Sequence, residues 1–100
     1  MSNIRHYMVD FTMDEPLSEE FFDLVSYQRA AVNRYFQEGK LAHYALCIEK
    51  SKLWLIIAAE SQIEVVEIIE NLPLSRFMEY DIHLLSQLDS YTVKPVFSLN

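Results

Sequence analysis

The chain has 100 residues, 51% of them hydrophobic, and its eight Lys and Arg against fifteen Asp and Glu give a net charge of −7. This length fits one compact domain, and the apolar share excludes a disordered chain. The acidic balance argues against contact with nucleic-acid phosphates, so we expect no nucleic-acid partner. The longest uninterrupted apolar run, at 53–59, is too short for a membrane helix, and no secretory segment is evident. We therefore expect no membrane partner and a cytoplasmic location.

Two rare residue types exclude further classes of protein. Gly39 is the only glycine, and phosphate-binding or dinucleotide-binding loops need several. Cys47 is the only cysteine, so no internal disulfide and no Cys-rich zinc site can form. We expect Cys47 to be a small buried apolar residue, because its spacing from His43 along a strand (about 7 Å) is loose for a nucleophile and its base. We expect no metal, because the histidines fall on separate predicted strands.

The first half of the chain predicts a strand, a helix and a second strand. Residues 4–13 alternate apolar with polar side chains, which is typical of a half-buried strand. A single helix is predicted next, with Ser18 as its N-cap and Gly39 just after its last turn. Residues 41–49 predict the second strand, and a tight reversal is expected at 50–51.

The second half predicts the same order of elements. Residues 52–59 are apolar on both faces, as a central strand should be. Ser61 and Glu64 form a predicted capping box at the start of the second helix, and Pro73 ends that helix. Residues 77–85 then predict the fourth strand.

This order is that of a ferredoxin-like βαββαβ fold, of the α+β class, with an antiparallel four-stranded sheet and two helices on one face. We expect residues 1–88 to form this domain. The other sheet face would leave a large apolar patch, so we expect it to pair with a second copy in a homo-oligomer. Residues 89–100 hold further apolar side chains, and we expect this C-terminal extension to pack on a neighbouring subunit.

Alternation along the strands places the polar side chains together on the open face of the predicted sheet. The set is His6, Asp10, His43, Cys47, Glu79, Asp81 and His83. The first and fourth strands are neighbours in this fold, so these residues of the two strands should lie close together, whereas His43 lies on an edge strand. Two interpretations stay open. These polar side chains are either solvated or hydrogen-bonded across a dimer interface, or they line a pocket for proton transfer and a small-molecule ligand. In the second, His6, Asp10, Asp81 and His83 would bind the substrate.

The stretch Gly39-Lys40-Leu41-Ala42-His43 is similar to the Gly-Lys-x-x-His stretch of muconolactone isomerases. Glu60-Ser61, Leu72-Pro73-Leu74 and Met78 follow at similar spacings, so the resemblance covers roughly 39–85. It implies a ferredoxin-like subunit, paired through sheet faces and assembled into a larger ring-like homo-oligomer. It also implies an isomerase without cofactor or metal, which shifts a proton in a small lactone in aromatic-compound catabolism.

The resemblance assigns catalytic roles to two residues. Lys40 would stabilise the substrate carboxylate or the developing enolate, and His43 would move the proton. Ala45 and Leu46 stand where the family carries a Trp-Arg pair, and Gln28 stands where it tends to carry a carboxylate. The alternative is therefore a non-catalytic ligand-binding or structural member of the dimeric α+β barrel superfamily.

Overall fold

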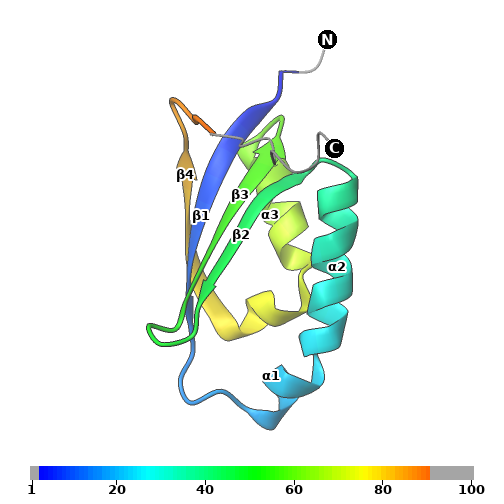
Figure 1. Ribbon diagram of the computed structural model, residues 1–100, viewed down its shortest axis with the longest axis vertical. Coiled ribbons are helices and arrows are strands. Elements are labelled where there is room, and N and C mark those ends of the chain that lie inside the picture. The colour runs from blue at the N-terminus through cyan, green and yellow to red at the C-terminus, as the bar shows by residue number, and fades with distance from the viewer. Residues whose placement is uncertain (1–2, 91–100) are drawn as a thin grey trace, which may run out of the picture.

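The computed structural model describes residues 3–90. Its elements are β1 (Arg5–Met13), α1 (Glu19–Asp23), α2 (Val25–Gln37), β2 (Leu41–Cys47), β3 (Lys52–Ala59), α3 (Gln62–Glu70), the 3₁₀ helix η1 (Pro73–Phe77) and β4 (Met78–Leu84). The strands form one antiparallel sheet in the order β2-β3-β1-β4, and α2 and α3 lie on the same side of it (Figure 1). The predicted ferredoxin-like α+β fold is therefore confirmed. The predicted extension lies outside the described residues from residue 91 onward.

The core lies between the helices and one face of the sheet, which we call the helix face. Val9 in β1 pairs with Leu55 in β3 and with Ile82 in β4, so apolar side chains run across three strands. Val9 and Leu55 are fully buried. Val32 from α2 and Ile69 from α3 close over them. Burial of such side chains stabilises a fold by about 1.5–3 kcal/mol each.

The prediction of a single helix before Gly39 is wrong in one respect. Leu24 divides this segment into α1 and α2. Ser18 caps α1 as predicted, since its Oγ accepts the Phe21 N–H at 3.1 Å. Leu24 then ends α1 and begins α2 without a side-chain cap. The break lets α1 follow its own direction, so that Phe21 packs against Met13 and Leu74 at the end of the sheet.

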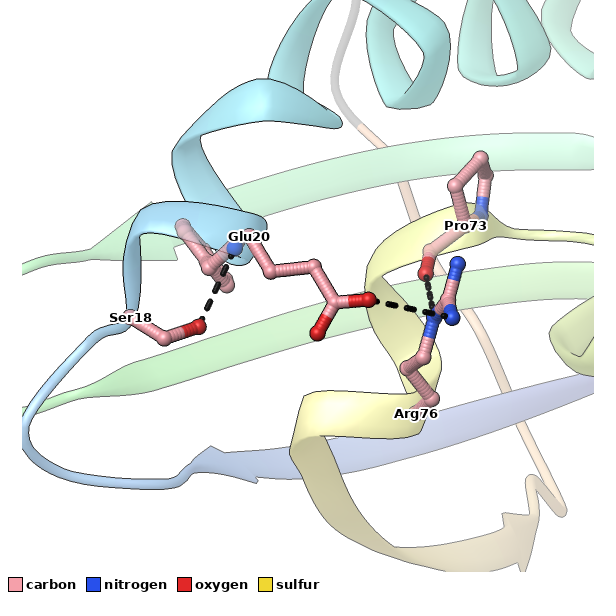
Figure 2. Close-up of polar contacts among 5 residues, drawn as sticks. Ser18, Glu20, Pro73 and Arg76 are labelled. Atoms are coloured by element: carbon pink, nitrogen blue, oxygen red, sulfur yellow. Dashed lines mark hydrogen bonds and ion pairs between the residues drawn. The ribbon is translucent and has the colours of Figure 1, made fainter.

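A second, smaller cluster joins α1 to η1 at that end of the molecule. The Phe21 and Phe77 rings meet edge to face, with centroids 5.7 Å apart. On the surface, Arg76 Nη1 lies 3.6 Å from Glu20 Oε2, and Arg76 Nε donates to the Pro73 carbonyl (Figure 2). Both members of the ion pair are well exposed, so the rings contribute more to this contact than the charges.

From β2 onward the elements follow the predicted order, but their ends differ and the unpredicted 3₁₀ helix η1 stands between α3 and β4. The Ser61 Oγ accepts the Glu64 N–H at 3.2 Å, as expected, but the Glu64 carboxylate accepts from the Glu60 N–H. Leu72 is buried, and η1 separates it from β4. Strand β2 ends at Cys47 rather than at residue 49, because the turn before β3 takes four residues. Ser51 closes that turn at a φ of 55° and donates its N–H to the Ile48 carbonyl.

Candidate functional site

The face of the sheet opposite the helices, the open face, carries the predicted polar set. His43 pairs with Ile56, Ile56 with Met8, and Met8 with His83, so these four residues form a line across all four strands. Ile56 lies between the buried Leu55 and Ile57 along β3, which places its whole line on the other face. The predicted orientation of His43 and His83 is therefore confirmed.

Lys40 and His43 owe their positions to two local features. Gly39 adopts a φ of +75°. Its N–H bonds to the Phe36 carbonyl and the Lys40 N–H to the Tyr35 carbonyl, the pair of bonds that defines a Schellman motif. The strand register then shifts between Leu41 and His43.

That shift in register explains how Lys40 and His43, three positions apart in the sequence, lie on the same face of the sheet. The Lys40 carbonyl accepts the N–H of Ala58, which is the next open-face residue of β3 after Ile56. In a regular strand, residues i and i+3 point to opposite faces. A bulge adds one residue to one strand and restores the parity. Lys40 is half-buried and His43 exposed in the single chain.

The carboxylates of the open face form a second group. Asp10 pairs directly with Asp81 across β1 and β4, and opposed like charges destabilise a sheet. Lys52 offsets this: its Nζ lies 2.5 Å from Asp10 Oδ1 and donates to Thr12 Oγ1 at 2.9 Å. Asp10 Oδ1 is shielded from solvent and has this ammonium as its ion-pair partner, although no well-aligned hydrogen bond joins them.

The open face brings some predicted residues together and keeps others apart. His6 lies beside β4, one open-face position from the line that contains His83. His43 and His83 stand on opposite edge strands, about 14 Å apart at ordinary strand spacing, so they do not meet within one chain. Cys47, predicted to be buried, is only half-buried, because it ends the edge strand β2.

A cavity that sequence reasoning missed lies on the helix face, between the sheet and α1, α2 and η1. Its volume is about 280 Å³, and none of the predicted site residues lines it. The lining is Met13, Leu17, Phe21, Phe22, Val25, Gln28, Arg29, Val32, Tyr44, Leu46, Ile48, Leu74 and Met78. Phe22, Val25, Leu46 and Ile48 are among the exposed large apolar side chains of the described residues. They give the cavity an apolar rim that is open to solvent.

Gln28 is the polar residue buried in this cavity, with 4% of its surface exposed. Its Oε1 accepts the Leu74 N–H at 3.1 Å and so ties α2 to η1. The sequence held a signal for it, because Gln28 lies at helical spacing between Leu24 and Val32, both apolar. A glutamine at a core-facing position is an exception that indicates a specific hydrogen bond or a ligand.

Two further findings concern residues 3–90. No helix there is long and apolar enough to cross a membrane. Nor does this part of the chain gather three or more His, Cys, Asp or Glu side chains in a position to hold a metal ion.

Fold and site together define a ferredoxin-like α+β domain with a partly polar open sheet face. Comparison with protein families matches residues 6–90 to the muconolactone delta-isomerase family, and the chain belongs to that family. The resemblance seen around Gly39 and His43 is therefore confirmed over most of the chain. Among curated proteins, none matches the chain significantly.

Proposed function

We propose that this protein is a cofactor-free isomerase that shifts a proton within a small unsaturated lactone. Membership of the muconolactone delta-isomerase family over residues 6–90 carries the proposal. The shared open-face position of Lys40 and His43 supports it, because a proton shift needs a base and a cation close to one another. The proposed setting is aromatic-compound catabolism in the cytoplasm.

The proposed reaction conserves every atom of the substrate. His43 takes a proton from a carbon conjugated with the lactone carbonyl, and the electron pair moves onto the carbonyl oxygen as a dienolate. The Lys40 ammonium stabilises that charge or the substrate carboxylate. His43 then returns the proton to another carbon of the conjugated system. His6, Asp10, Asp81 and His83 are proposed to orient the substrate. All four lie on β1 or β4. Where one of them is too far from His43 of its own chain, we propose that it reaches the substrate of a facing subunit.

The same proposal includes a second copy of the chain on the open face. The middle of this face is apolar and half-buried in the single chain, with Met8, Trp54 and Ile56 at its centre. Charged and polar groups on the edge strands surround it, which is the usual anatomy of an interface. We expect sedimentation to give a dimer or larger ring at micromolar concentration and the substitution Ile56→Lys to shift it toward monomer. A stable wild-type monomer would contradict the pairing.

The isomerase proposal is tested with muconolactone as substrate, followed by ultraviolet absorbance or NMR. We expect turnover by the wild-type protein and a rate about 10²–10⁴ lower in His43→Ala, the usual effect of removing a general base. Glu49→Ala, an exposed substitution just beyond β2, is the control. Lys40→Met should also lower the rate, and Lys50→Met, in the exposed turn, is its control. Undiminished activity in His43→Ala would remove His43 from the mechanism.

A second candidate function, ligand binding without catalysis, has one observation in its favour. Leu46 and Gln28, which replace charged residues of the family, both line the helix-face cavity. Neither side chain can exchange a proton near neutral pH, and among residues 3–90 no Asp, Glu, His, Lys or Cys lines the cavity. A wild-type protein that binds muconolactone without converting it would favour this function.

A further inference from the structure

We propose that Asp81 is a specificity-determining residue of the open-face site and that this site prefers a lactone without a carboxylate. The proposal rests on the isomerase function, because it names the substrate class of the same site. It is carried by the distribution of charge over the open face. The half of this face formed by β1 and β4 holds more carboxylates than it has cations to neutralise them. A substrate with its own negative charge is therefore disfavoured there.

Asp81 lies in the middle of β4 with its side chain on the open face. Its neighbours along the strand, Tyr80 and Ile82, pack against the core of the helix face, so Asp81 points the other way. It is exposed in the single chain and stands directly opposite Asp10 of β1. Glu79 holds the next open-face position of β4. Three carboxylates thus occupy adjacent positions of two paired strands.

The lysine on this half of the face neutralises Asp10 and leaves Asp81 without a partner. Lys52 reaches across from β3, with its Nζ 2.5 Å from Asp10 Oδ1 and 2.9 Å from Thr12 Oγ1. Among residues 3–90, no Lys or Arg forms an ion pair with Asp81. Lys40 also belongs to the open face, but it stands at the start of β2, about 14 Å from β4 at ordinary strand spacing. The negative charge of Asp81 is therefore not balanced by its own chain within the described residues.

The unbalanced charge acts differently on charged and uncharged substrates. A substrate carboxylate close to Asp81 would meet a like charge that no cation offsets. The carbonyl group of an uncharged lactone carries only a partial negative charge, so the same carboxylate repels it weakly. That weak repulsion turns the carbonyl toward the Lys40 ammonium, where the dienolate charge is stabilised. Asp81 therefore orients an uncharged lactone and penalises an anionic one.

The test compares muconolactone with its methyl ester, which keeps the lactone ring and carries no charge. Both are assayed at about pH 8, above the range in which an imidazole ordinarily changes charge, so that His6 and His83 of the same half add little positive charge. For the wild-type protein we expect a higher kcat/KM with the ester than with muconolactone. Salt screens exposed charges, so this preference should shrink at about 0.5 M salt.

Two variants should move this preference in opposite directions. Asp81→Asn removes the unbalanced carboxylate, so the ratio of kcat/KM for the ester to that for muconolactone should fall about two- to fivefold, the scale of an exposed charge pair. Most of the change should appear in the KM for muconolactone, because the repulsion acts on the bound substrate and the transition state alike. Lys52→Met leaves Asp10 unbalanced as well, so the same ratio should rise by a similar factor. Asp23→Asn in α1 and Lys50→Met in the turn before β3, both at exposed positions, are the matched controls and should leave the ratio unchanged.

The outcomes separate this proposal from the isomerase function on which it rests. A ratio that is unchanged in Asp81→Asn, or that moves in the same direction in Asp81→Asn and Lys52→Met, would overturn the specificity assignment and leave the isomerase function intact. A wild-type preference for muconolactone over its ester would overturn it too. Failure of the wild-type protein to convert either substrate would overturn the isomerase function and this proposal with it.

Discussion

The two faces of strand β3 differ although the strand is apolar on both. Leu55 and Ile57 point to the helix face and are fully buried, while Trp54 and Ile56 point to the open face and are half-buried. The chain supplies its own cover for one face, through α2 and α3, and supplies none within the described residues for the other. Hydrophobicity along a strand therefore indicates that both faces avoid water, and only the arrangement of the helices decides which face needs a partner.

The polar groups differ between the faces as well. On the open face, charges and histidines stand on separate strands and meet through strand pairing, as Asp10 and Asp81 do. On the helix face, Gln28 is the one buried polar residue of the described chain, and a single hydrogen bond to Leu74 fixes it. Proton transfer is therefore proposed on the open face, and simple binding on the helix face.

The largest expected effect comes from adjacent residues of β3. Leu55→Ala should lower the free energy of unfolding by about 2–5 kcal/mol, because it leaves a cavity in a closed core. Ile56→Ala should cost less at low protein concentration, where the open face is wet, and its cost should grow as the concentration rises. Denaturant titration at two protein concentrations measures both. Equal, concentration-independent losses would break the contrast between the faces.

A middle-sized effect is expected from the charges of the open face. Lys52→Met removes the ammonium beside Asp10 and leaves two opposed carboxylates, so we expect a loss of about 0.5–1 kcal/mol. In that background Asp81→Asn should recover part of the loss. Thermal unfolding of the single and double variants checks this, and additive effects would show that the three groups do not interact.

The smallest effect is expected at the surface pair that joins α1 to η1. Arg76→Met removes a contact of 3.6 Å between exposed groups, so the free energy of unfolding should change by less than about 0.5 kcal/mol. Phe77→Ala removes the ring packed on Phe21 and should lower the free energy of unfolding by more than Arg76→Met does. Denaturant titration of the two variants compares these losses. A reversed order would mean that the charges, not the rings, hold the cavity wall.

Local patterns in the sequence predicted most of the fold. Alternation predicted the strands and their faces, the Ser18 and Ser61 caps marked both helix starts, and Gly39 marked a helix end. These signals are local, because parity, caps and positive φ depend on a few neighbouring residues. They were also enough to place His43 on the open face, and the short stretch around it was enough to indicate the family.

Tertiary structure decided what depends on distant residues. Leu24 breaks the first helix because Phe21 packs on Met13 and Leu74, far away in the sequence. The bulge that puts Lys40 and His43 on one face is defined only by pairing with β3. Gln28 becomes part of a cavity only when Leu74 arrives from η1, 46 residues later, to occupy its oxygen. The cavity is formed by several elements that are distant in the sequence, so no single stretch of sequence predicts it.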